Sequence, residues 1–278
     1  MALYRYFLYN KKYYRYRRVK VVGNDYTEFV RSIKQQTGID LGLYKEKQMK
    51  RRLTSLRDKR GFDTFSGYFE AVKNNRDLLT ELLDRMTINV SEFFRNRSRW
   101  DRLKFNLLPE LIKDKNQINV WSAACSTGEE PYTLAILLHE FLRWDQMKIL
   151  ATDLDETVLH KAQQGIYHER SLKEVTTGQK RKYFHQNGQV FQVNNALKEV
   201  ISFKQHNLLA DLYTGMYDLI CCRNVLIYFT DEAKTKIYTQ FANHLKQGGI
   251  LFVGSTEQIF QPEKYGLKAI DSFFYQKV

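Results

Sequence analysis

The sequence predicts an α/β fold, in which a mostly parallel sheet carries a small antiparallel β insertion and follows an all-α N-terminal domain. From about residue 116 onward, short apolar runs alternate with helical patterns, as in a parallel sheet covered by helices on both faces. Residues 24–96 show helical patterns alone. Residues 182–203 carry short alternating runs separated by turn residues, which favours a small β subdomain. The 278 residues suffice for one large domain or two modest ones.

The chain starts with a segment of unusual composition. Residues 1–20 contain six Tyr, seven Lys or Arg and no acid. A secretory signal peptide needs an apolar central region, which this segment lacks. We expect residues 1–23 to be a flexible basic extension, followed by a helical domain over residues 24–96 and a second domain over residues 97–278.

Four helices are expected in residues 24–96. Asp25 is placed to cap the first helix, which runs to Thr37 and ends at Gly38. The other three are expected over about residues 43–60, from Thr64 onward, and over about residues 76–86. Helix 43–60 carries eight Lys or Arg beside only two acids. Because crowded like charges repel each other, this pattern favours a surface that meets an acidic partner over a solvated face of mixed charge.

The composition of the whole chain agrees with an acidic partner. The net charge of +13 suits nucleic acid, an anionic membrane face or a protein surface rich in Glu and Asp. Three cysteines without a C-x-x-C motif indicate a reduced, cytoplasmic protein. The six His show no ligand spacing, so we expect no metal site, and no apolar run is long enough to span a membrane.

The second domain should contain five strands, three helices between them and an entry helix over about residues 100–112. The strands are expected over about residues 118–122, 148–152, 200–203, 217–222 and 250–254, and the helices over about residues 131–142, 156–164 and 231–246. Gly248-Gly249 is expected to form the turn before strand 250–254, and residues 269–278 a last edge strand. In the β subdomain, Asn187-Gly188 is a hairpin signal.

Residues 118–132 are the stretch around which this domain is organised. An apolar strand passes through small residues and enters a helix at Pro131, with Ser126 and Thr127 each three residues before a Glu, the spacing of a capping box. Strand, tight turn and helix open a nucleotide pocket in α/β sheets. A single Gly and two acids do not match a phosphate-binding loop. They suit a cofactor with a positively charged end, such as S-adenosylmethionine, although an ordinary capped helix would also fit.

Polar residues also follow the next strands. Asp153 is placed to bind ribose hydroxyls, while Asp155 better suits a helix cap. After the following strand, Asn207 and Leu208 could bind the edge and the face of an adenine.

Strand 217–222 runs into another polar segment. Asn224 offers a carbonyl to a cofactor ammonium group, and Tyr228 a hydroxyl near the transfer site. Each of these residues taken separately could be structural. Because the carboxyl ends of neighbouring parallel strands meet at one edge of a sheet, the set predicts a binding site there.

These motifs resemble the CheR family of chemotaxis receptor glutamate methyltransferases, most closely its Gram-positive type. The matching runs are residues 87–95, 121–132, 151–155, 207–208, 222–229 and 253–257. The resemblance covers residues 24–278 and implies a helical N-terminal domain, a Rossmann-like methyltransferase domain and a small β subdomain. It further implies a protein-glutamate O-methyltransferase that esterifies glutamates on the cytoplasmic helices of chemotaxis receptors, in receptor adaptation.

The resemblance also assigns residues. The S-adenosylmethionine site would comprise Asn89, Ser91, Arg95, Glu129, Asp153, Asn207, Leu208, Asn224 and Val225. Arg95 and Tyr228 are the candidates for holding the substrate carboxylate. The acidic receptor helices would meet Lys50, Arg51, Arg52 and Arg57 of the cationic helix.

Two other functions remain open at this stage. A nucleic-acid methyltransferase would suit the charge, but the segment Cys222-Arg223-Asn224-Val225 lacks the prolines typical of amino-group methylation, and Cys221 and Cys222 lie within an apolar strand. A non-catalytic S-adenosylmethionine-binding regulator is the third reading. The complete pocket together with Tyr228 favours turnover.

Overall fold

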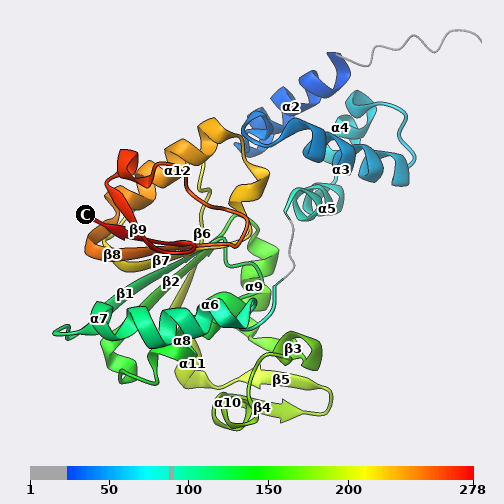
Figure 1. Cartoon of the computed structure of the whole chain (residues 1–278). Coiled ribbons are helices and arrows are strands. Elements are labelled where there is room, and N and C mark those ends of the chain that lie inside the picture. Colours follow the sequence, from blue (N-terminus) through cyan, green and yellow to red (C-terminus); the bar gives the residue numbers. More distant parts are fainter. Residues whose placement is uncertain (1–23, 88–90) are drawn as a thin grey trace, which may run out of the picture.

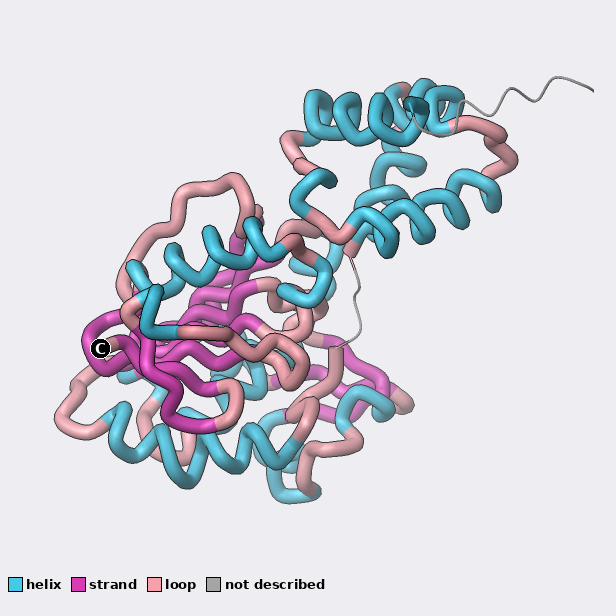
Figure 2. The backbone as a smooth tube through the Cα atoms, turned by 45° about the horizontal axis from the view of Figure 1, so that its top comes forward, coloured by secondary structure: helices cyan, strands magenta, loops and turns pink. Residues whose placement is uncertain are grey.

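The computed structural model describes residues 24–87 and 91–278, and shows a helical domain beside a larger α/β domain (Figures 1 and 2). The expectations for residues 1–23 and for Asn89 fall outside the described residues. None of the described helices is long and apolar enough to cross a membrane.

The helical domain buries one apolar cluster among its helices. These are α2 Asn24–Thr37, η1 Leu41–Leu43, α3 Glu46–Lys59, α4 Phe65–Lys73 and α5 Arg76–Met86. The sequence predicted that Asp25 caps its own helix, and this prediction is wrong. The Asp25 carboxylate accepts hydrogen bonds from the N–H groups of Phe65 and Ser66, because packing of α2 against α4 places it opposite the unpaired first-turn donors of α4.

The larger domain is built on a seven-stranded sheet in the order β6-β2-β1-β7-β8-β10-β9. Its strands are β1 Ile118–Ala123, β2 Met147–Asp153, β6 Ile201–Gln205, β7 Tyr217–Cys222, β8 Leu245–Val253, β9 Leu267–Asp271 and β10 Phe274–Lys277. In the sheet order, the first five strands are parallel to one another. The strand β10 is antiparallel to both of its neighbours, β8 and β9. The predicted sheet is therefore correct over its parallel part.

Two predictions at the end of the chain are wrong. Residues 269–278 form no single edge strand, because the chain reverses near Phe273, at a φ of 69°, and β10 inserts between β8 and β9. Gly248 and Gly249 form no turn before a strand but lie inside β8. A Cβ on Gly249 would lie 2.8 Å from the Lys246 carbonyl oxygen, so the glycine allows a close approach where the register with β7 shifts.

Helices cover both faces of the sheet. Figure 1 shows α6, α7 and α8 along one face and α12 along the other. The helices are α6 Arg97–Arg102, η2 Leu103–Leu107, α7 Leu108–Ile112, α8 Glu129–Leu138, α9 Glu156–Gln164, α10 Thr177–Tyr183, α11 Asn195–Glu199 and α12 Asp231–Asn243, with short turns η3 Trp144–Gln146, η4 Glu169–Leu172, η5 Leu226–Tyr228 and η6 Pro262–Tyr265. The predicted entry helix starts earlier than expected and contains a π-helical turn, η2, just before Pro109.

The β subdomain is a three-stranded antiparallel sheet in the order β3-β5-β4. Its strands are β3 Ile166–His168, β4 Phe184–Asn187 and β5 Val190–Val193. Asn187 and Gly188 lie where the chain turns from β4 into β5, as the hairpin signal predicted. The strand predicted over 200–203 is confirmed as β6 of the main sheet, so the β subdomain ends before it; the backbone of Ile201 to Gln205 pairs in parallel with β2.

A buried acid, Asp218, accepts several hydrogen bonds at the end of the sheet opposite the carboxyl ends of the parallel strands. Asp218 accepts hydrogen bonds from Lys115 Nζ at 2.7 Å, Lys246 Nζ at 2.8 Å and Asn119 N–H at 2.9 Å. Burial raises the pKa of the carboxyl, but these hydrogen bonds outweigh it and lower the pKa below its ordinary value.

We predict that Asp218→Ala lowers the free energy of unfolding by about 1–3 kcal/mol, because it leaves a buried N–H without an acceptor. Since the pKa is lowered in the folded state, this contribution is complete above the ordinary pKa of about 3.9 and disappears as the pH falls below it. Urea unfolding at several pH values measures the effect. Asp145→Ala, which removes an exposed pair with Arg143, is the control and should leave the midpoint unchanged. Equal stability of both variants would contradict the prediction.

Candidate active site

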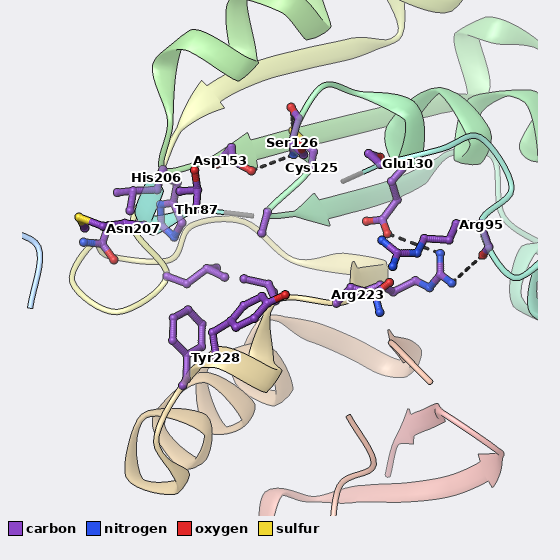
Figure 3. Close-up of a pocket in the computed structure, with 18 of the residues that line it drawn as sticks. Thr87, Arg95, Cys125, Ser126, Glu130, Asp153, His206, Asn207, Arg223 and Tyr228 are labelled. Atoms are coloured by element: carbon purple, nitrogen blue, oxygen red, sulfur yellow. Dashed lines mark hydrogen bonds and ion pairs between the residues drawn. The ribbon is translucent and has the colours of Figure 1, made fainter. Parts of the chain in front are cut away.

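A pocket lies at the carboxyl ends of the parallel strands, beside the helical domain (Figure 3). The sequence-predicted residues that line it are Ser91, Arg95, Asp153, Asn207, Leu208, Asn224, Val225 and Tyr228. Glu129 is not among the residues that line this pocket, whereas its neighbour Glu130 is. The structure thus brings together predicted residues from three strand ends, those of β2, β6 and β7, and from the junction between the domains.

The turn after β1 shapes the floor of the pocket. Ala124, Ser126 and Gly128 have left-handed backbone conformations, with φ values of 62°, 50° and 95°. A Cβ on Gly128 would lie 2.8 Å from Ala162 Cβ, so this position requires glycine. Gly128 is the N-cap of α8 and no side chain caps this helix, so the predicted capping boxes and the start at Pro131 are wrong. The Thr127 hydroxyl instead donates a hydrogen bond to the carboxylate of Glu129, two residues away.

Asp153 connects this turn to β2. Its carboxylate accepts hydrogen bonds from Ser126 N–H at 2.8 Å and from Asp155 N–H at 3.1 Å. Burial of the side chain raises its pKa, and these hydrogen bonds oppose the rise. Asp155 caps α9 through the N–H groups of Thr157 and Val158, as predicted. The two acids therefore have separate roles.

Glu129 and Glu130 point to different surroundings. The Glu129 carboxylate accepts hydrogen bonds from the hydroxyls of Thr127 and Ser91. The bond from Ser91 connects the start of α8 to the segment between the two domains. Glu130 accepts a hydrogen bond from Ser122 Oγ at 2.8 Å and lies 3.9 Å from the guanidinium of Arg223. Burial raises the pKa of both carboxyls.

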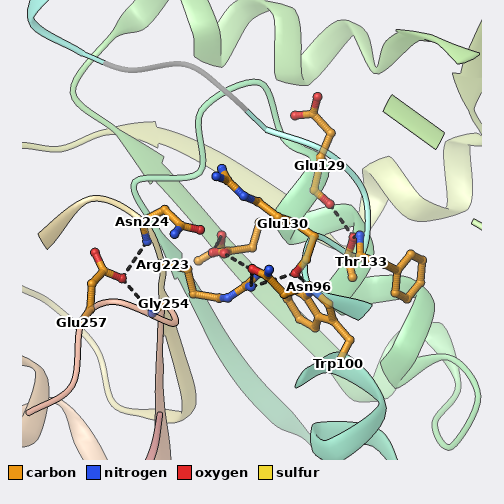
Figure 4. Close-up of polar contacts among 12 residues, drawn as sticks. Asn96, Trp100, Glu129, Glu130, Thr133, Arg223, Asn224, Gly254 and Glu257 are labelled. Atoms are coloured by element: carbon orange, nitrogen blue, oxygen red, sulfur yellow. Dashed lines mark hydrogen bonds and ion pairs between the residues drawn. The ribbon is translucent and has the colours of Figure 1, made fainter. Parts of the chain in front are cut away.

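The ends of β6 and β7 supply the amide side chains. Asn207 Oδ1 accepts a hydrogen bond from Leu209 N–H, which fixes the loop after β6. Asn224 has a left-handed φ of 62°, and its N–H donates to the carboxylate of Glu257 at 2.7 Å. Glu257 also accepts from the N–H groups of Gly254 and Ile227 (Figure 4). This buried acid therefore holds the segment that carries Asn224 against the end of β8.

Tyr228 lies where the two domains meet. Its carbonyl accepts a hydrogen bond from Lys45 N–H at 2.8 Å, and Thr230 N–H donates to the Leu43 carbonyl at 2.9 Å. The guanidinium of Arg52 lies over the Tyr228 ring, 4.9 Å from its centroid. Burial raises the pKa of the phenol, although Arg52 and Arg95 oppose the rise. The phenol therefore stays protonated at neutral pH and can donate a hydrogen bond.

The four cations proposed for partner binding do not form one surface. Lys50 lies over the Tyr26 ring, and Arg57 packs over Phe65 and pairs with Asp58 within the helical domain. Arg51 is exposed, and only Arg52 reaches the pocket region. The four cations therefore have different surroundings, because a helix distributes neighbouring residues around its circumference, and their role in partner binding stays a prediction.

Comparison with known proteins decides the family. Residues 89–273 match the CheR methyltransferase SAM binding domain, and residues 24–87 match the CheR methyltransferase all-alpha domain. The chain belongs to the CheR methyltransferase family. It is therefore a methyltransferase that uses S-adenosylmethionine, as the acids of its pocket indicated.

Several chemotaxis proteins are similar to this CheR-family chain over most of their length. The chemotaxis protein methyltransferase of Listeria innocua is 45% identical over 254 residues, which are 91% of this chain and 97% of the relative. Those of Borreliella burgdorferi and Vibrio cholerae, the latter named chemotaxis protein methyltransferase 1, are each 32% identical; both alignments cover 87% of this chain, and 90% and 91% of the relative.

The groups that line the pocket fit S-adenosylmethionine. Asp153 would offer a buried carboxylate to the ribose hydroxyls, and Asn207 and Asn224 would offer amides to the adenine and to the amino-acid end. Glu130 adds a carboxyl group to the pocket lining. A carboxylate there would attract the sulfonium and ammonium of this cofactor and repel a phosphate.

Sequence reasoning missed several residues that line the pocket. They are Tyr44, Met86, Trp100, His206 and Arg223, besides Cys125, for which only a backbone role was expected, and Glu130. Arg223 and Glu130 lie within the runs 222–229 and 121–132 that resemble the family, so the sequence could have indicated that they line the pocket. Tyr44 comes from the helical domain, and no local pattern places it beside a strand end.

We predict that Asp153→Asn weakens S-adenosylmethionine binding roughly 10- to 100-fold, because a charged acceptor is replaced by a neutral one. Since the pKa of Asp153 is raised, wild-type affinity should start to fall at a higher pH on acidification than an ordinary carboxyl would cause. Titration calorimetry over a pH series measures both effects. Asp231→Asn, at the exposed start of α12, is the control. Unchanged affinity in a folded Asp153→Asn variant would refute the assignment.

Proposed function

We propose that this enzyme transfers the methyl group of S-adenosylmethionine to glutamate side chains on the cytoplasmic helices of chemotaxis receptors, and so forms the methyl esters used in receptor adaptation. The observation that carries the proposal is that Arg95 and Tyr228, far apart in the sequence, line one pocket together with the residues proposed to bind the cofactor. The names of the relatives, chemotaxis protein methyltransferases, support the same function. Three free, buried cysteines fit the expected cytoplasmic location.

The chemistry proposed needs no general base. S-adenosylmethionine supplies an electrophilic methyl group, and a glutamate with a pKa of about 4.3 is already ionised at neutral pH. The residues of the chain therefore have to align the carboxylate with the methyl group and exclude water from it. Alignment of this kind can supply roughly 7–11 kcal/mol.

Arg95 and Tyr228 are suited to that task. The protonated Tyr228 phenol donates a hydrogen bond to one carboxylate oxygen, and Arg95 attracts the carboxylate by charge. A tightly paired carboxylate is a weaker nucleophile, so Arg95 serves orientation more than activation. The Tyr228 ring is fixed by Arg52 above it and by the backbone hydrogen bond from Lys45.

The helical domain gives the substrate its docking surface in this proposal. Arg52 reaches the pocket region from α3 and its neighbour Arg51 is exposed on the same helix, so an acidic receptor helix that approaches the pocket would meet both charges. Because these charges are partly or fully exposed, their contribution should depend strongly on salt.

The first test measures methyl transfer itself. We expect the enzyme to move label from methyl-labelled S-adenosylmethionine to a receptor cytoplasmic fragment, and mild base to release the label as volatile methanol, because esters hydrolyse and N-methyl groups do not. Arg95→Ala and Tyr228→Phe should each reduce this label. Base-stable label on the fragment, or label on added RNA or DNA instead, would contradict the proposal.

A second test addresses docking. Arg51→Glu should raise KM for the receptor fragment roughly 3- to 10-fold at low salt and leave cofactor affinity unchanged, because it replaces attraction by repulsion. Steady-state kinetics over a salt series measures the change. Lys113→Glu, an equal charge reversal in an exposed loop before β1, is the matched control. If both variants change KM equally, net charge alone explains the effect.

A further inference from the structure

Arg95 lies in a strained segment of backbone. The residues on either side of it, Phe94 and Asn96, both have left-handed conformations, with φ values of 53° and 61°. Such conformations cost free energy for any residue that has a Cβ atom, so they persist only where the surroundings hold them. The position of Arg95 therefore depends on the contacts that hold this segment.

Two donors hold the backbone at Arg95 itself. Its carbonyl oxygen accepts hydrogen bonds from Arg223 Nη2 at 2.8 Å and from Trp100 Nε1 at 3.0 Å. Arg223 Nη2 also lies 3.3 Å from Asn96 Oδ1. The end of β7 is in this way joined to the segment that carries Arg95.

The guanidinium of Arg223 is itself buried beside Glu130 and Trp100 (Figure 4). It packs into the corner formed by two edge-to-face aromatic rings, 4.9 Å from the centroid of Trp100 and 4.7 Å from that of Phe252. Its Nη1 lies 3.9 Å from a carboxylate oxygen of Glu130, and only 3% of the side chain is exposed. A planar guanidinium stacks on aromatic rings and directs its N–H donors in fixed positions, whereas a lysine ammonium is a compact charge without this planar fit.

We propose that Arg223, paired with Glu130, is a positioning residue for methyl transfer, because it fixes the backbone of Arg95 and hence the place of the Arg95 guanidinium. The inference rests on the proposed function, in which Arg95 orients the substrate carboxylate. Arg223 acts through Arg95 and not on the substrate. A merely structural pair would instead affect folding alone.

The test is a double-mutant cycle on the full chain. Arg223→Lys keeps the positive charge but loses the planar fit, and should lower kcat for the receptor fragment roughly 10- to 100-fold. The KM for the fragment and the dissociation constant of S-adenosylmethionine should change much less. In an Arg95→Ala background, Arg223→Lys should cause no further loss. An equal loss in both backgrounds, or no loss in the first, overturns the proposal.

Hydrogen exchange provides a readout that a change in activity cannot mimic. Amides of residues 91–96 should exchange faster in Arg223→Lys than in the wild type, while those of β1 stay protected. Arg102→Lys, which alters a surface arginine paired with Asp271, is the matched control and should change neither exchange nor kcat. Unchanged exchange in Arg223→Lys counts against the proposal.

A second variant keeps the test decisive if Arg223→Lys fails to fold. Asn96→Gly removes the other acceptor of Arg223 and tolerates the left-handed backbone. It should lower kcat in the wild-type background only. Failure of the proposed function would appear differently, as absence of methyl ester from the wild type or full turnover by Arg95→Ala, whereas the exchange measurement needs no substrate.

Discussion

The contact between Asp153 and the turn after β1 is the constraint on which the pocket depends. One buried carboxylate at the end of β2 accepts the N–H of Ser126, in a turn that has three left-handed residues. This contact fixes the distance between two neighbouring strand ends, so that the space between them can hold a nucleoside. Because an unpaired buried carboxylate is costly, the same group that shapes the turn also requires polar partners within the pocket. Structure and binding therefore depend on one side chain.

Methyl transfer further requires that two domains meet accurately. Backbone hydrogen bonds join Lys45 to Tyr228 and Thr230 to Leu43, and so connect the segment that carries the phenol to the start of the cationic helix. On the other side of the pocket, the buried Arg223–Glu130 pair holds the segment of Arg95. The substrate carboxylate would lie between these two supports. Its reactivity is intrinsic, so what the fold contributes is geometry and a dry environment.

The sequence predicted most of the fold because its strands and helices have clear periodicity. The parallel strands, the cap at Asp155 and the hairpin at Asn187-Gly188 followed from local pattern alone. Contacts between distant segments did not. Asp25 caps a helix forty residues away, and the strand after Phe273 inserts into the sheet instead of joining its edge. In the pocket, the place of Tyr44 and the aromatic contacts of Arg223 likewise depend on tertiary packing, which no local spacing encodes.

The pH dependence of the transfer step distinguishes catalysis by alignment from catalysis by a general base. The single-turnover rate constant should be measured with saturating S-adenosylmethionine and receptor fragment. Because the substrate glutamate is ionised and the pKa of Tyr228 is raised above its ordinary value of 10.0, we predict a rate that is constant between about pH 6 and about pH 9. A tenfold rise per pH unit that levels off above a pKa near neutrality would show a general base and contradict the account.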